Sequence, residues 1–302
     1  MAGRRTKMPG EFDFIHWIQL QQKARGLIEL SAGDDLAILR WPADQLLLVG
    51  VDQVMEGVHF DSGKHSPRQI GGKVMNRNLS DCAAMGCQPV AALASVSLPR
   101  SRGMEYAKEI YLGMKEAGEV FDCDIVGGET GTWDGGLVAS VSILGACAKG
   151  KAVLRSGARV GDCIYVTGEL GGSLLGRHME FVPRVREGIE IGRSGKATAM
   201  IDLSDGVSSD LTRICQASGV GAVIDAAKIP IHEDAIKMAK SDGRLALEHA
   251  LHDGEDYELL FTGCGLEGFG IEIGRIVVGD GVLIEEERKR TKLEARGWEH
   301  RW

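Results

Sequence analysis

The sequence predicts a protein of two domains, the first of which is α/β. Its 302 residues exceed the usual size of one domain core, so two domains of comparable length are expected. Apolar strand-like runs alternate with helical periodicity over the first half. A segment rich in Gly and basic residues at positions 149–161 separates two strand runs and places the domains at residues 1–150 and 151–302.

The first half is expected to hold three strands and two helices. The strands are predicted at residues 46–51, 90–98 and 137–148. The helices are predicted at residues 69–85 and 104–120. The first strand ends at Asp52, and the first helix carries Asn78 and Asp81 near one face because they lie three residues apart.

The second half restarts with a strand at residues 163–167. Further strands are predicted at residues 200–203, 221–224, 257–262 and 271–283, and helices at residues 207–217, 233–239 and 245–251. Gly168, Gly171 and Gly172 predict a flexible turn before a helix that begins near Ser173. Such a turn is compatible with phosphate at the helix N-terminus.

Charge and cysteine content narrow the class of protein. Lys and Arg total 35 against 43 Asp and Glu, which gives a net charge of -8 and argues against nucleic-acid binding. An acidic protein that binds anionic phosphates needs local positive charge at the binding site, which bound metal ions supply. The seven cysteines are odd in number and form no CxxC pair, so neither a disulfide framework nor a zinc knuckle is expected.

The sequence also predicts a soluble, cytoplasmic protein without membrane contact. Arg4, Arg5 and Lys7 resemble the charged start of a signal peptide, but Pro9-Gly10-Glu11 follows where an apolar core is required. The longest apolar stretch, residues 137–148, is interrupted by serines and is too short to span a bilayer.

Carboxylates recur at Gly-rich or strand-ending corners of the chain. They are Asp34, Asp35, Asp52, Asp81, Glu129, Asp202 and Asp205. If they converge, a divalent cation must balance their like charges, and Mg²⁺ commonly bridges one or two carboxylates to substrate phosphates. The alternative is that each is a separate turn or cap residue, because Asp favours both positions.

Four further residues have both a functional and a structural interpretation. Arg155, in a Gly-flanked loop, can bind a phosphate or be an exposed linker residue. His59 can donate to a phosphate or pack beside a strand, and Glu255 can recognise an amino group or lie in a solvated turn. Trp298 can stack on an aromatic ligand or anchor the terminus. GxxxxGK[ST], HRD and DFG motifs are absent from the sequence, which disfavours P-loop and protein kinases.

The collected motifs, in order, resemble those of the thiamine-monophosphate kinase family, in the superfamily that includes aminoimidazole-ribonucleotide synthetase. They are GEFDFI, GDDLAIL, VDQVMEGVHF, NLSDCAAMG, VGGET, LRSGARVGD, IDLSDGVSSDL, DGEDYELLF and RGWEH. The resemblance covers the chain from Gly10 to Trp298. It implies a two-domain fold like that of aminoimidazole-ribonucleotide synthetase, with an N-terminal α/β domain whose sheet forms a homodimer and a C-terminal α+β domain that closes over the nucleotide.

The same resemblance implies ATP-dependent, in-line conversion of thiamine monophosphate to thiamine diphosphate with several Mg²⁺ ions and no covalent nucleophile. The implied metal ligands are Asp35, Asp52, Asp81, Glu129, Asp202 and Asp205, with Asp34 as a neighbour. The implied contacts to ATP, the co-substrate, are Tyr111, Gly128, Glu129, Arg155 and Ser204. The implied contacts to the thiamine substrate are His59, Glu255 and Trp298.

The chain departs from the family pattern at several positions. Glu129 stands where the family usually has Asp, Gly50-Val51 replaces a Ser/Thr pair, and Gln53 replaces a common Thr. The segment between Met179 and Thr198 is shorter than usual. Two alternatives therefore stay open: a degenerate nucleotide-binding homologue without efficient transfer, or another ATP-using synthetase of the superfamily.

Overall fold

The computed structural model describes residues 11–22, 25–31 and 37–297 and divides into two compact units. Unit 1 comprises Met1–Ala43, Val49–Asn78 and Pro89–Leu144. Unit 2 comprises Asp44–Leu48, Leu79–Gln88 and Gly145–Trp302. The division passes through one helix between Asn78 and Leu79. The predicted domain boundary at residue 150 stays a prediction.

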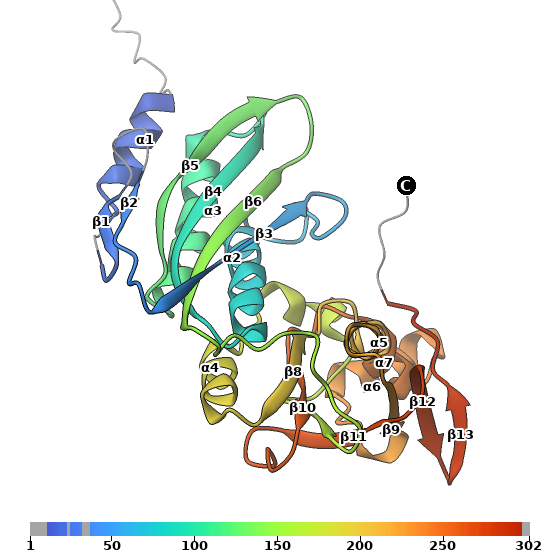
Figure 1. The fold of residues 1–302 in the computed structure, drawn as a ribbon. Coiled ribbons are helices and arrows are strands. Elements are labelled where there is room, and N and C mark those ends of the chain that lie inside the picture. Colours follow the sequence, from blue (N-terminus) through green and yellow to red (C-terminus); the bar gives the residue numbers. More distant parts are fainter. Residues whose placement is uncertain (1–10, 23–24, 32–36, 298–302) are drawn as a thin grey trace, which may run out of the picture. The chain divides into compact units, whose positions relative to one another are not determined.

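Unit 1 is built around a four-stranded sheet in the order β3-β6-β4-β5. Its strands are β3 (Gln45–Met55), β4 (Gln88–Pro99), β5 (Asp124–Trp133) and β6 (Val138–Ala148), some of whose end residues belong to unit 2. β4 and β5 are parallel, and α3 (Met104–Glu119) connects them (Figure 1). Parallel strands need such a crossover connection, because a tight turn reverses the chain direction and makes the next strand antiparallel.

Helices α2 (Pro67–Ala84) and α3 cross at unusually short range within unit 1. A Cβ atom at Gly71 would lie 2.0 Å from the Ile110 carbonyl oxygen, and one at Gly113 would lie 2.0 Å from the Arg68 carbonyl oxygen. Only glycine permits this backbone contact. The remaining elements of this part of the chain are α1 (Glu11–Gln19), β1 (Ile28–Leu30) and β2 (Ile38–Leu39).

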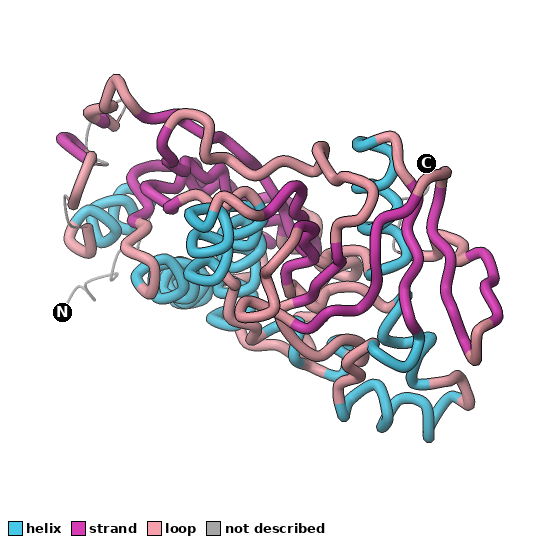
Figure 2. The backbone as a smooth tube through the Cα atoms, turned by 60° about the horizontal axis from the view of Figure 1, so that its bottom comes forward, coloured by secondary structure: helices cyan, strands magenta, loops and turns pink. Residues whose placement is uncertain are grey.

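Unit 2 contains a seven-stranded sheet in the order β13-β12-β9-β11-β7-β10-β8. Its strands are β7 (Cys163–Val166), β8 (Ala197–Asp202), β9 (Gly221–Asp225), β10 (Leu259–Gly263), β11 (Ile271–Val277), β12 (Gly281–Glu286) and β13 (Lys289–Lys292). Its helices are α4 (Val185–Ser194), α5 (Val207–Ser218), α6 (Glu233–Asp242) and α7 (Ala246–His252), with 3₁₀ turns η1 (Ser173–Leu175), η2 (Arg177–Met179) and η3 (Ala226–Lys228). Figure 2 draws the strands of the protein in magenta.

The sheet of unit 2 is antiparallel except where β12 pairs with β9. Buried aliphatic side chains of α5, including Leu211 and Ile214, join those of the strands in one core. This confirms the α+β class expected for the second half. Most predicted strands and helices are also confirmed, and their bounds shift by a few residues.

Four expectations are corrected. β3 runs on to Met55, so Asp52 lies inside the strand rather than at its end. The VGGET motif lies within β5 rather than at a corner, because pairing with β4 continues through Glu129 to Trp133. The helix expected from Ser173 is a three-residue 3₁₀ turn, since Gly176 with φ 145° ends it. A turn at Gly279 and Gly281, both with positive φ, splits the strand expected at residues 271–283 into β11 and β12. Across the part of the chain that is described, no helix is long and apolar enough to cross a membrane.

Candidate active site

Asp52 is held from three sides within unit 1. Arg77 of α2 donates from Nε to Asp52 Oδ2 at 2.7 Å. Asn78 Oδ1 accepts the Asp52 backbone N–H at 3.0 Å, and Ser140 Oγ donates to the Asp52 carbonyl at 3.2 Å. The guanidinium neutralises the carboxylate and orients it.

His59 follows β3 and is positioned through its own turn. His59 Nδ1 accepts the backbone N–H of Met55 at 3.1 Å, which leaves Nε2 to carry the proton of the neutral ring. Lys73, which is fully buried on α2, donates from Nζ to the His59 carbonyl at 2.8 Å. The same helix therefore fixes both Asp52 and the turn that bears His59.

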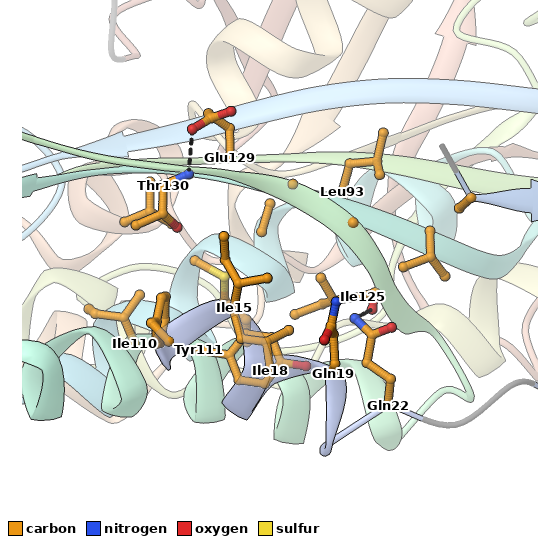
Figure 3. Close-up of a pocket in the computed structure, with 18 of the residues that line it drawn as sticks. Ile15, Ile18, Gln19, Gln22, Leu93, Ile110, Tyr111, Ile125, Glu129 and Thr130 are labelled. Atoms are coloured by element: carbon orange, nitrogen blue, oxygen red, sulfur yellow. Dashed lines mark hydrogen bonds between the residues drawn. The ribbon is translucent and has the colours of Figure 1, made fainter. Parts of the chain in front are cut away.

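A cavity of about 880 Å³ in unit 1 is lined by α1, α3, β4 and β5 (Figure 3). Its walls are mostly apolar, with Ile15 and Ile18 of α1 opposite the sheet. Tyr111 lines this cavity and meets the Trp17 ring edge-on at 5.5 Å. Burial raises the pKa of Tyr111 to about 12, so its hydroxyl stays a hydrogen-bond donor at neutral pH.

Gly128 and Glu129 line the same cavity from β5. A Cβ at Gly128 would lie 1.9 Å from the Ala94 carbonyl oxygen of β4, so any side chain here would push the strands apart. Glu129 Oε1 accepts the Thr130 backbone N–H at 3.1 Å, and its carboxylate lies on the other side of the strand from Ile15 and Tyr111 (Figure 3). The two faces of β5 are thus chemically different.

Unit 2 brings Asp202 to the end of α2. Ser80 Oγ donates to Asp202 Oδ2 at 2.6 Å, and both side chains are buried. Asp81 follows Ser80 in the same helix, while Asp202 is the last residue of β8. The two motifs NLSD and IDLSD, which are far apart in sequence, therefore lie side by side.

Asp205 belongs to a crowded group of carboxylates that follows β8. Arg213 of α5 donates to Asp205 and, at 2.6 Å, to Asp210. Asp210 Oδ2 also accepts the Asp205 backbone N–H at 3.0 Å. Burial, with repulsion from Asp202 and Asp205, raises the pKa of Asp210 to about 8. Negative charge is in excess at this corner.

Glu255 is joined directly to the LSDG motif. Its backbone N–H donates to the Ser204 carbonyl at 2.8 Å. Its Oε2 lies 2.9 Å from His178 Nδ1, and its Oε1 accepts the Tyr257 hydroxyl at 3.2 Å. Arg155 is exposed in the segment that leads to β7, and its carbonyl accepts from Ser218 Oγ at 3.4 Å.

The predicted site residues are divided between the two units, and three of them lie outside the described residues. Asp52, His59, Tyr111, Gly128 and Glu129 lie in unit 1, and Asp81, Arg155, Asp202, Ser204, Asp205 and Glu255 lie in unit 2. Asp34, Asp35 and Trp298 fall outside the described residues. Over positions 11–22, 25–31 and 37–297, no group of three or more His, Cys, Asp and Glu side chains is arranged to hold a metal ion. The full metal-ligand set therefore stays a prediction.

Sequence reasoning missed the cations and donors that hold these carboxylates and the turn that bears His59. They are Arg77, Lys73, His178, Ser80 and Arg213. Arg213 had a local signal, because it lies three residues after Asp210 on one helix face. The others pair over long sequence distances, which no spacing rule reveals.

Two family models match the chain. The model for AIR synthase related protein, N-terminal domain, matches residues 33–147, and that for the C-terminal domain matches residues 178–281. Together they cover more than half of the sequence and contain most of the predicted site.

Relatives of known name match most of the length. Thiamine-monophosphate kinase of Rhodopirellula baltica is 42% identical over 258 residues, 83% of this chain and 81% of the relative. The crystal structure of thiamine-monophosphate kinase from Stenotrophomonas maltophilia matches with a TM-score of 0.77 and 32% identity over 92% of this chain and 96% of that one. The structure of AaThiL complexed with AMPPCP and TMP matches with a TM-score of 0.78 and 32% identity over 99% and 100% of the two chains.

Proposed function

The chain belongs to the AIR synthase related family and, within it, to the thiamine-monophosphate kinases; from this premise we propose that it phosphorylates thiamine monophosphate with ATP in one in-line step assisted by Mg²⁺. The observation that carries the proposal is the match over 99% of the chain to a structure described with AMPPCP and TMP bound. The enzyme is thus a phosphotransferase whose acceptor is itself a phosphate.

Tyr111, Gly128, Glu129, Arg155 and Ser204 are proposed to contact ATP. Three features support this. Tyr111 offers a protonated hydroxyl on the wall of a cavity large enough for a small ligand. Gly128 is exposed and lines the same cavity, so a ligand can reach its backbone. Arg155 is exposed and can fork onto a phosphate.

The residues present fit Mg²⁺. The donors are carboxylate oxygens, which Mg²⁺ prefers, and burial together with repulsion from Asp202 and Asp205 raises the pKa of Asp210. We propose that Asp35, Asp52, Asp81, Glu129, Asp202 and Asp205 hold the ions, with Asp34 beside them. When bound, Mg²⁺ neutralises the phosphate oxygens and aligns the two phosphates.

His59, Glu255 and Trp298 are proposed to bind the thiamine monophosphate substrate. The Nε2–H of His59 is a donor for the acceptor phosphate, since Nδ1 is occupied by the Met55 N–H. Glu255 offers acceptor oxygens to the exocyclic amino group of the pyrimidine ring. An aromatic side chain such as Trp298 suits the cationic thiazolium.

A homodimer through the sheet of unit 1 is also proposed. β3 is an edge strand, and its Val49 and Val51 side chains are 69% and 65% exposed. An exposed, apolar edge strand is a ready surface for pairing with a second copy. Sedimentation equilibrium tests this: a dimer is expected for the wild type, and a monomer for a Val49→Lys, Val51→Lys double variant. A monomeric wild type would contradict the proposal.

The function is tested by coupled ADP release with Mg²⁺ and a panel of acceptors: thiamine monophosphate, thiamine, pyridoxal phosphate and formylglycinamidine ribonucleotide. ADP release that depends on thiamine monophosphate, with thiamine diphosphate as product, is expected. Nucleotide binding without ADP release on any acceptor would identify a degenerate homologue instead. Release with the amidine ribonucleotide alone would identify a synthetase.

A further inference from the structure

Four side chains of one segment contact four consecutive residues of another in unit 2. The pairs are Arg177 with Asp256, His178 with Glu255, Phe181 with Tyr257, and Arg184 with Glu258. We call residues 177–184 the strap. The strap lies against a segment that contains Glu255, the proposed acceptor-binding carboxylate. Its contacts therefore determine the orientation of that carboxylate.

The flanking contacts of the strap are strong. Arg177 Nη2 donates to the buried Asp256 at 2.8 Å, and Arg184 donates to both oxygens of Glu258 at 2.8 and 2.5 Å. Such paired, charge-assisted bonds fix orientation as well as distance. The Phe181 and Tyr257 rings stack with centroids 3.9 Å apart. The strap is therefore anchored on both sides of His178.

The central contact of the strap is the one to Glu255. His178 Nδ1 lies 2.9 Å from Glu255 Oε2, and the two side chains are 9% and 18% exposed. An ionised carboxylate only accepts hydrogen bonds, so Nδ1 carries the hydrogen here. The Tyr257 hydroxyl donates to Oε1 at 3.2 Å. Both carboxylate oxygens of Glu255 are thus held by neighbouring side chains of the protein.

The backbone under Glu255 is strained. Glu255 and Tyr257 have φ of 52° and 53°, the left-handed region that side chains other than glycine seldom adopt. Such a conformation is costly and persists only where the surroundings determine it. The Ser204 carbonyl accepts the Glu255 N–H, and the Leu203 carbonyl accepts the Tyr257 N–H at 2.9 Å. The LSDG motif therefore sets the backbone, and His178 sets the side chain.

We propose that His178 is a positioning residue, which fixes the orientation in which the Glu255 carboxylate meets the phosphate acceptor. The inference rests on the proposed function, because Glu255 is assigned there to the pyrimidine amino group. His178 supplies no proton to the reaction; it removes the freedom of a flexible carboxylate before the acceptor binds.

The test compares His178→Ala with His178→Asn, since the Asn amide nitrogen can replace Nδ1 as a donor. In His178→Ala, equilibrium binding of thiamine monophosphate without ATP is expected to weaken about tenfold or more, and its KM to rise equally, while the KM for ATP is unchanged. His178→Asn is expected to recover most of the binding. His232→Ala is the matched control, because His232 lies in the same unit and caps α6.

Three results would overturn the inference. One is acceptor binding within twofold of wild type in His178→Ala, where about tenfold is expected; another is an equal loss of ATP affinity, which indicates general damage. The third is a crystal structure of His178→Ala in which Glu255 keeps its wild-type position. The crystal structure decides the inference even if the wild type binds no thiamine monophosphate, an outcome that refutes the proposed function alone.

Discussion

At the scale of single residues, Asp52 shows how neighbouring side chains orient a proposed metal ligand. Arg77 pairs with it through a side chain that is only 14% exposed. The Arg77 guanidinium orients the Asp52 carboxylate and balances its negative charge. The carboxylate itself, at 33% exposure, stays open to solvent.

Asp52→Asn is expected to abolish ADP release while the protein remains folded. One ligand charge is lost, so the metal ions are bound too weakly to align the phosphates. The partly exposed pair with Arg77 contributes about 1 kcal/mol or less to stability, so the melting temperature should change little. Asp134→Asn, which removes an exposed carboxylate paired with Arg100, is the control and should keep full activity. Near-wild-type kcat in Asp52→Asn at saturating Mg²⁺ would contradict the assignment.

Glu129 is expected to act as a ligand in spite of its extra methylene. Its carboxylate is exposed and bonded to its own strand, and the additional side-chain torsion of Glu lets the carboxylate turn toward an ion. Glu129→Gln should therefore lose most activity across a Mg²⁺ titration, whereas Glu129→Asp should retain it. Glu105→Gln, an exposed position on α3, serves as control. An inactive wild type that Glu129→Asp restores would show that this position has left catalytic use.

At the scale of elements, the close crossing of α2 and α3 fixes the helix that carries Arg77 and Asn78. Gly113→Ala places a Cβ about 2.0 Å from the Arg68 carbonyl, so the helices must separate. A loss of about 1–3 kcal/mol in the free energy of urea unfolding is expected. Gly103→Ala, with no atom within 4 Å of the new Cβ, is the control. Equal stability of the two variants would mean that the helices do not approach this closely.

The strap also contributes a pH dependence. Burial raises the pKa of Asp256 to about 7, although the Gly171 N–H and Arg177 oppose the shift. Between the unfolded pKa, about 4, and the folded value, the native state binds more protons, so this residue's contribution to stability falls as pH rises. The free energy of unfolding is measured in urea at pH 4, 5.5 and 7.5 for the wild type and for Asp256→Asn. As the pH rises, the value for the wild type should fall relative to that for the variant. A difference that does not vary with pH would show that Asp256 titrates normally.

At the scale of the whole molecule, the reaction is expected to proceed without a covalent intermediate. The acceptor monophosphate has a second pKa of about 6 and is already largely anionic, so it can attack the γ-phosphorus directly. All seven cysteines are free, and most are buried. Rapid quench of the enzyme with γ-labelled ATP should trap no labelled protein, with or without acceptor. A labelled enzyme competent to form thiamine diphosphate would overturn the in-line step.

Much of this fold follows from local sequence, and much of the site does not. The amphipathic pattern of residues 207–217 predicts α5 almost to its ends, because one apolar face packs on the sheet. The VGGET strand was not predicted, since its glycines are β-breaking and only pairing with β4 makes it extended. The left-handed backbone of Glu255 has no sequence signal either, because Ser204, about fifty residues away, imposes it.

The interleaving of the two units sets an order on biosynthesis. Residues 44–48 and 79–88 leave the ribosome early, yet they belong to the unit whose last piece, Gly145–Trp302, is made last. Unit 1 has all its residues once Leu144 has emerged, whereas unit 2 must wait for residues that follow Gly145. A chain cut after residue 150 would carry residues 79–88 without Asp202, which accepts from Ser80, and without α4, whose Gly188 lies against Ala83. Leu79, Cys82 and Ala83, which are buried in the full chain, would then be exposed, and chaperones or proteases would recognise them.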